Sequence, residues 1–356
     1  MKLVIQPPAE TGDPHADLMT FLQRAIEIEH ATIPPYLTAM YSLLPGKNES
    51  ARAIIRSVVV EEMSHMALAA NILSAIGGAP AFTAAGFIPT YPGGLPYKIG
   101  DQPGQPAFEV HLAPFSLDVV QNTFMVIELP ETPPLDFPVV EAFAVTQHDD
   151  TFKTIGAFYQ HVRELIIQLG PDVYSGAPTH QLTHPHGTFV IRSQSDAIRA
   201  VDQIVRQGEG TSKLPTGDAG GEIAHYYRFA EIVKGRMLVP DPMQSLGYAY
   251  SGSEIAFDRT GVVPIVTDAK QSQYPAGSEA ARISRQFNGL YGNMLRVLEQ
   301  AYTGKDVVAN VIGLMFDMKI IAQRLMSIPI PQPSDIAGAP AFAAPTFEFA
   351  ETHAAL

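Results

Sequence analysis

Two four-residue runs, Glu62-Met63-Ser64-His65 and Glu222-Ile223-Ala224-His225, constrain this chain more than any other feature. Each has the pattern Glu-x-x-His in a segment whose apolar residues recur with the period of an α-helix. A helix turns once in about 3.6 residues, so residues three apart share one face and direct a carboxylate and an imidazole to one point. Two such pairs on apolar helices, with a further acidic helix before them, are typical of a carboxylate-bridged two-metal site.

Apolar residues recur with helical spacing over much of the chain. Their spacing predicts helices over 17–42, 50–76, 116–128, 151–169, 196–207, 221–235, 278–302 and 307–326. Pro34 and Pro35 fall inside the first range and lack backbone donors, so we expect a kink or a division there. The last range is apolar on several sides, which predicts a helix buried over much of its surface. The Pro- and Ala-rich segment after residue 327 is expected to lie extended on the surface.

These ranges predict an all-α fold, a four-helix bundle with long loop-rich insertions and two additional C-terminal helices. We assign residues 1–240 to the bundle, with insertions at about 79–150 and 170–220. Residues 241–330 are expected to form a loop segment and two helices packed on the bundle, and residues 331–356 an extended Pro/Ala-rich tail.

Composition excludes several classes of partner and site. The formal charge of −13 argues against nucleic acid, because binding to phosphates requires clustered Lys and Arg. The absence of cysteine excludes thiolate sites and leaves His and carboxylate side chains as the metal ligands. The N-terminus lacks the apolar stretch of a signal peptide, and no apolar run approaches the ~20 residues that crossing a bilayer requires. We therefore expect a cytoplasmic protein with neither a nucleic-acid nor a membrane partner.

A metal site explains the acidic residues on the apolar helix faces. A buried carboxylate is costly unless a charge compensates it. Glu29, Glu62 and Glu222 hold such positions, and a shared divalent cation would compensate all three. His65 and His225 would complete two coordination spheres, a donor set that suits iron, manganese or zinc. The simpler interpretation is that each Glu-x-x-His pair interacts on the surface within one helical turn.

A four-helix two-metal site also needs a glutamate from the third helix. Within 151–169 that residue is Glu164, toward the C-terminal end. Glu128, which closes the preceding short helix, is an alternative, and a site with five protein ligands is another. The predicted metal ligands are Glu29, Glu62, His65, Glu164, Glu222 and His225.

Several segments resemble a known family. The run Glu-His-Ala-Thr-Ile-Pro-Pro-Tyr-Leu-Thr-Ala-Met-Tyr-Ser at 29–42, followed by Glu-Glu-Met-Ser-His-Met at 61–66, is similar to the ferritin-like domain of the iminophenyl-pyruvate dimer synthase family, found in enzymes of the violacein and rebeccamycin pathways. Further similar segments are 155–159, 207–211, 225–229 and 345–348. The resemblance implies a ferritin-like four-helix bundle with a non-haem metal centre. Relatives often carry Glu where this chain has Ala157, which puts the third-helix ligand in question.

These features predict a non-haem di-iron or di-manganese oxidoreductase that acts on a small organic substrate, with amino-acid-derived substrates implied by the resemblance. One alternative is an iron-binding, ferroxidase ferritin-like protein, although the long insertions suggest a roofed pocket instead. Another is a ferritin-like scaffold with a degenerate metal site, for which Ala157 is the reason. The expected partners are a small-molecule substrate and O₂, with a homo-oligomer left open. Tyr36, Tyr159 and Tyr226 either lie near the metal or pack as ordinary aromatic residues, and the sequence assigns no catalytic residue.

Overall fold

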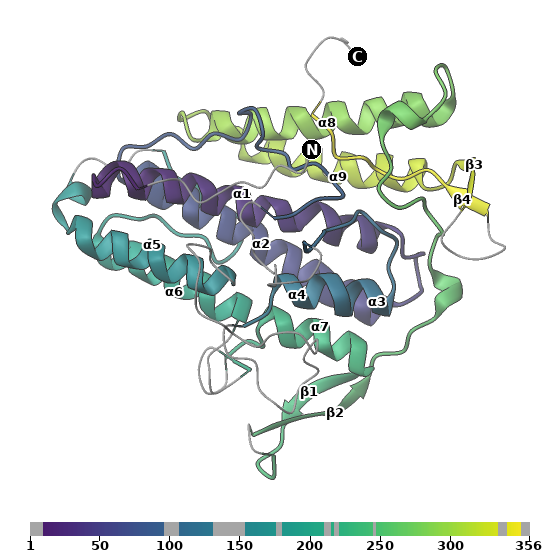
Figure 1. Cartoon of the computed structure of the whole chain (residues 1–356), viewed down its shortest axis with the longest axis horizontal. Helices are drawn as coiled ribbons and strands as arrows, with labels where there is room; N and C mark the ends of the chain where they lie inside the picture. The colour runs from purple at the N-terminus through teal and green to yellow at the C-terminus, as the bar shows by residue number, and fades with distance from the viewer. Residues whose placement is uncertain are drawn as a thin grey trace.

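Helices arranged in three layers make up most of the structure (Figure 1). This computed structural model describes residues 10–95, 107–130, 154–175, 180–209, 215–216, 221–244, 247–333 and 340–349. The central layer is an antiparallel pair of long helices, α1 (Pro14–Tyr41) and α2 (Glu49–Ala75). On one side lies a second pair, α8 (Glu279–Ala301) and α9 (Val308–Leu325), and on the other side lie several shorter helices.

The shorter helices complete a bundle around α1 and α2. They are α3 (Leu117–Val119), the π-helical η1 (Val120–Phe124), α4 (Met125–Ile127), α5 (Ile155–Leu169), α6 (Gln194–Glu209) and α7 (His225–Lys234). The pair α5–α6 lies at one end of the layer, and η1 and α4 pack with α7 at the other end (Figure 1). Two pairs of short helices therefore replace the third and fourth helices of a simple bundle, and the mainly helical fold predicted from the sequence is confirmed.

Helix α1 continues through Pro34 and Pro35, so of the two predicted outcomes, a kink or a division, the division does not occur. Proline has no backbone N–H, and Pro35 therefore leaves the carbonyl of Ala31 without its normal helical donor. The hydroxyl of Tyr91, in the loop after α2, donates to that carbonyl at 2.7 Å. This bond satisfies a buried backbone group that the proline would otherwise leave unpaired.

Helix α7 begins at His225, later than the predicted start near residue 221. Ala224 is its extended N-cap residue, and the preceding Ile223 forms an isolated antiparallel bridge with Thr216. Glu222 therefore does not share a helix with His225, and the assumption that helical spacing aligns these two side chains is wrong.

Two short hairpins and three 3₁₀ turns connect the helices. The strands are β1 (Arg236–Pro240) with β2 (Tyr248–Glu254), and β3 (Pro329–Pro333) with β4 (Pro340–Phe342); the 3₁₀ turns are η2 (Asp172–Ser175), η3 (Arg259–Gly261) and η4 (Gln271–Gln273). None of the described helices combines the length and the apolar character needed to cross a bilayer.

Two predictions about burial in the C-terminal part are wrong. Helix α9 packs against α8 and leaves large apolar side chains in solvent, with Phe316 65% and Ile320 61% exposed. In contrast, residues 341–347 of the tail are mostly buried, including Ala343, Ala344 and Phe347. The ring of Phe347 packs edge-on against Phe287 and Tyr291 of α8, so this extended segment lies inside the molecule.

Candidate metal centre

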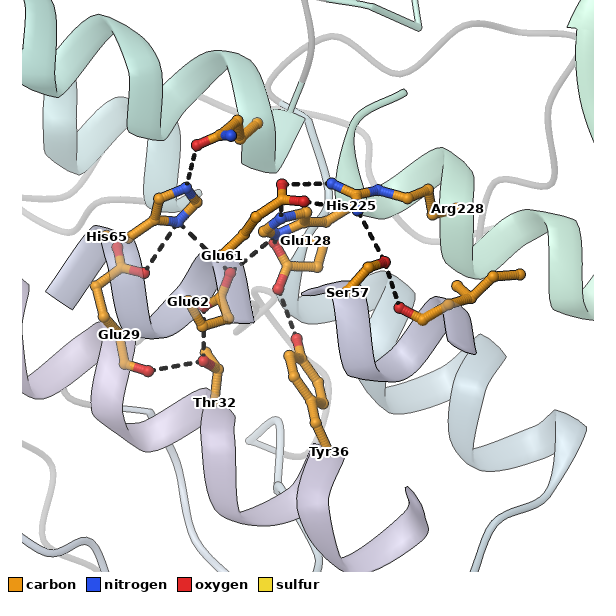
Figure 2. A network of polar contacts seen from close by, with 12 residues as sticks. Glu29, Thr32, Tyr36, Ser57, Glu61, Glu62, His65, Glu128, His225 and Arg228 are labelled. Atoms are coloured by element: carbon orange, nitrogen blue, oxygen red, sulfur yellow. Dashed lines mark hydrogen bonds and ion pairs between the residues drawn. The ribbon is translucent and has the colours of Figure 1, made fainter. Parts of the chain in front are cut away.

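Three carboxylates and two imidazoles converge inside the bundle. Glu29 comes from α1, Glu62 and His65 come from α2, Glu128 is the C-cap residue of α4, and His225 is the first residue of α7. Each of these residues is at most 5% exposed. Their side chains point toward one another between the helices (Figure 2). The bundle thus gathers ionisable groups where water screens their charges poorly.

The five side chains form two overlapping groups of three. Glu29, Glu62 and His65 offer ligand atoms within 4.8 Å of one another, and so do Glu62, Glu128 and His225. Nδ1 of His65 lies 3.5 Å from Glu29 Oε2 and 3.6 Å from Glu62 Oε1. Nδ1 of His225 lies 2.9 Å from the same Glu62 oxygen and 3.4 Å from Glu128 Oε2. Glu62 therefore belongs to both groups.

The outer nitrogen of each imidazole is held by an oxygen acceptor. Nε2 of His65 lies 2.9 Å from Gln207 Oε1, and Nε2 of His225 lies 3.1 Å from Glu61 Oε2. Arg228 fixes Glu61 by donating to both of its carboxylate oxygens, at 2.8 and 2.5 Å. When each imidazole is neutral, as metal binding requires, these acceptors place its proton on Nε2 and leave the lone pair of Nδ1 facing the carboxylates. Histidines that bind metals are commonly oriented in this way.

Buried hydroxyl groups donate hydrogen bonds to the carboxylate oxygens that face away from the imidazoles. Tyr159 donates to Glu29 Oε1 at 2.5 Å, and Tyr36 donates to Glu128 Oε1 at 2.6 Å. Thr32 Oγ1, on the turn after Glu29, donates to Glu62 Oε2 at 2.7 Å. Each carboxylate thus has one oxygen held by a hydroxyl and one directed toward an imidazole. Tyr36 and Tyr159 lie at the site, as one of the two sequence interpretations predicted.

The proximity of these groups raises the pKa values of the two carboxylates and the two imidazoles that surround Glu62. Burial and the charge of Glu62 raise the pKa of Glu29 to about 7, and the same two causes raise the pKa of Glu128. Burial disfavours imidazolium, but the contacts of His65 with Glu29 and Glu62 outweigh it and raise the pKa of His65 to about 10. The pKa of His225 is likewise raised, by its carboxylate neighbours against burial. The cluster therefore strongly favours bound positive charge, from protons or from a cation.

The orientation of His225 fits a metal better than a hydrogen bond. Its Nδ1 makes no hydrogen bond to any described residue, although it lies 2.9 Å from Glu62 Oε1. The raised pKa of His225 means that a proton balances the neighbouring carboxylates in the metal-free protein, and a divalent cation held by Nδ1 and these carboxylates would replace that proton. Carboxylate and imidazole without sulfur suit iron, manganese or zinc. The residues therefore fit a centre of two metal ions that share Glu62.

The structure brings together four of the six residues predicted as ligands, namely Glu29, Glu62, His65 and His225. Glu164 lies on the exposed face of α5, where Gln160 donates to its carboxylate at 3.2 Å. Glu222 is exposed and lines a separate cavity over Glu61. Neither residue belongs to the two buried groups.

Glu128, which the sequence offered as the alternative to Glu164, supplies the third carboxylate of the cluster. Tyr159, two residues after Ala157 on α5, reaches the site with its hydroxyl, whereas Ala157 offers no ligand atom. The absence of Glu at 157 therefore does not leave the cluster without a third carboxylate. Glu61, Gln207 and Arg228 were not predicted as site residues, although all three lie in segments that resemble the family.

The fold and this cluster define the class of protein: a helical bundle built around buried carboxylate and imidazole groups. A family model described as Ferritin-like matches residues 22–234, more than half of the chain. The chain therefore belongs to the ferritin-like family. The matched range contains all five residues of the cluster.

A solved structure supports the same fold. The chain is similar to the crystal structure of a ferritin-like protein from Caulobacter vibrioides, determined at 1.95 Å resolution, with 24% sequence identity and a TM-score of 0.59. The similarity covers 89% of this chain and 96% of that protein. Comparison with curated proteins gives no match.

Proposed function

We propose that this chain is a non-haem two-metal oxidoreductase that uses O₂ on a small organic substrate, similar to proteins of the iminophenyl-pyruvate dimer synthase type. The observation that carries this proposal is the pair of three-residue groups that share Glu62, each with an imidazole Nδ1 aimed at carboxylate oxygens. Iron is the proposed metal, with manganese as the second choice, since both accept this donor set and undergo redox changes.

Each protein group has a defined task in this proposal. Glu29 and His65 would hold one ion, Glu128 and His225 the other, and Glu62 both; when bound, the ions supply the capacity to activate O₂. The hydroxyls of Tyr36 and Tyr159 hold the outer carboxylates in place by hydrogen bonds.

A small cavity lies beside these ligands. Its volume is about 20 Å³, and apolar side chains such as Ile127, Ile155 and Ile204 form part of its wall. A water-sized molecule fits in such a volume, but an organic substrate does not. The cavity therefore suits O₂ or water at the centre and requires an organic molecule to bind elsewhere.

A ferroxidase role is the alternative, and it needs nothing beyond the centre itself. A much larger cavity of about 650 Å³ over Glu61 and Gln207 favours the organic substrate, since ferrous ions need no space of that size. A scaffold with a degenerate site is the third possibility, and the buried set of three carboxylates and two imidazoles argues against it.

Metal analysis combined with oxygen uptake tests the proposal. The protein is purified without metal, supplied with Fe(II) under anaerobic conditions, desalted and measured for bound iron, with Glu164→Gln as a matched control far from the centre. We expect two iron ions per chain in both proteins. O₂ uptake that requires an added organic reductant supports the oxidoreductase, whereas rapid uptake with Fe(II) alone and repeated turnover supports the ferroxidase. Failure to bind iron or manganese would refute both.

A further inference from the structure

A large cavity lies directly over Glu61 and Gln207, the two residues that hold the outer nitrogens of the histidines. It has a volume of about 650 Å³ and lies between α2, α6 and the residues just before α7. Glu61 and Gln207 form part of its wall, and these residues hold Nε2 of His225 and of His65. A molecule bound there is separated from the metal centre by one layer of side chains.

Positive charge gathers in this cavity although the chain is acidic overall. Arg56 of α2 and Arg206 of α6 both line it, and both are exposed to solvent. Arg56 makes no hydrogen bond or ion pair to any described residue, and Arg206 donates to the backbone oxygen of Asp202 at 3.2 Å. The carboxylate of Glu61 is already neutralised by Arg228. Two guanidinium groups in a concave site attract anions, and their planar donors match a carboxylate.

Other wall residues indicate what kind of anion fits. Ala53 and Val60 provide apolar surface, as an organic molecule requires. Glu222 is the acidic wall residue without a partner in the described structure, and it limits the net positive charge. Cavities of about 300–1,000 Å³ are the usual size for small-molecule sites.

We propose that this cavity is a binding site for a small organic carboxylate, held by Arg56 and Arg206 above the metal centre. Binding itself needs no metal; the further step, that this carboxylate is the substrate, rests on the proposed function. Gln207 would then lie between the bound anion and His65, and Glu61 between it and His225.

Calorimetric titration of the metal-free full-length protein tests the site. The probes are benzoate, its neutral isostere benzamide, and inorganic phosphate. We expect benzoate to bind and benzamide to bind at least tenfold more weakly, because the guanidinium contacts require a negative charge. Equal affinity for benzoate and benzamide would overturn the proposal, as would tighter binding of phosphate than of benzoate.

Substitutions of the two cavity arginines and of a control arginine test where benzoate binds. Arg56→Gln and Arg206→Gln should each weaken benzoate binding about tenfold, whereas Arg285→Gln, which changes an exposed arginine on α8, should leave it unchanged. Glu222→Gln should strengthen benzoate binding by up to about fivefold, because it removes a repulsive charge from the wall. Equal loss in Arg285→Gln, or no loss in both cavity variants, would place the anion elsewhere.

The carboxylate site and the two-metal oxidoreductase can be refuted independently of each other. Arginine-dependent benzoate binding in a protein that takes up no metal would support the carboxylate site and refute the two-metal oxidoreductase. Normal metal loading without benzoate binding would do the reverse.

Discussion

The shared position of Glu62 makes a quantitative prediction about metal binding. Its Oε1 atom faces Nδ1 of both imidazoles, at 3.6 Å from His65 and 2.9 Å from His225. Glu62→Gln keeps the size of the side chain and an oxygen that accepts the hydrogen bond from Thr32, but it removes the negative charge. We expect Glu62→Gln to lose both metal ions, whereas Glu29→Gln should lose one.

The stability gained on metal binding gives the magnitude. At free metal 100 times Kd, each site adds about 2.7 kcal/mol to the free energy of unfolding. The unaltered protein should therefore gain about 5 kcal/mol, Glu29→Gln about half of this, and Glu62→Gln almost none. For a chain of this length, about 5 kcal/mol corresponds to an increase in Tm of roughly 5–10 °C.

The assay compares each protein with and without metal, so that the effect of the substitution on the metal-free fold cancels. Bound metal is counted by elemental analysis, and Tm is followed by circular dichroism. Glu164→Gln and Glu222→Gln serve as controls, and both should behave like the unaltered protein because their carboxylates lie outside the buried groups. A Glu62→Gln variant that retains one full ion, or a control that loses one, would refute the shared-ligand reasoning.

Three further predictions concern the surroundings of the ligands. Gln207→Ala should weaken metal binding roughly 10–100-fold, measured by competition with a chelator, because Nε2 of His65 loses its acceptor. The metal-free protein should become less stable as pH rises from about 6.5 to 10 in denaturant titrations, since the folded pKa of His65 is raised to about 10 and its protonated form is stabilised by folding; His65→Asn should flatten this slope. Tyr159→Phe should lower the free energy of unfolding by about 1–3 kcal/mol, because Glu29 loses a buried hydrogen bond, whereas Tyr41→Phe should have a smaller effect.

Local periodicity predicted the helices well because each helix carries its own apolar pattern. The predicted range 278–302 agrees to within one residue at each end with α8 at Glu279–Ala301, and 307–326 agrees equally well with α9 at Val308–Leu325. Periodicity does not reveal what covers an apolar helix, so the exposed side chains of Phe316 and Ile320 were unforeseen. For the same reason the sequence did not show that residues 341–347 of the tail would be mostly buried.

The site was predictable where both members of a pair lie on one helix. Glu62 and His65 on α2 obey helical spacing, and Glu29 lies on the buried face of α1. At the second pair the spacing was misleading, because α7 starts at His225 and excludes Glu222. Glu128 follows the π-helical turn η1, which contains more residues per turn than an α-helix and so changes the face that the next residues present. No α-helical pattern extrapolated from the sequence accounts for such a turn.

The bond between Tyr91 and the carbonyl of Ala31 has a consequence for how this sequence can change over evolution. Replacing Pro35 with a residue that has a backbone N–H would provide a second donor for that carbonyl and remove the need for the tyrosine hydroxyl. Losing Tyr91 while Pro35 stays would instead leave a buried carbonyl, two residues from Glu29, without any donor. Tyr91 should therefore be lost more readily in chains in which position 35 is no longer proline, and these two positions should covary among related chains.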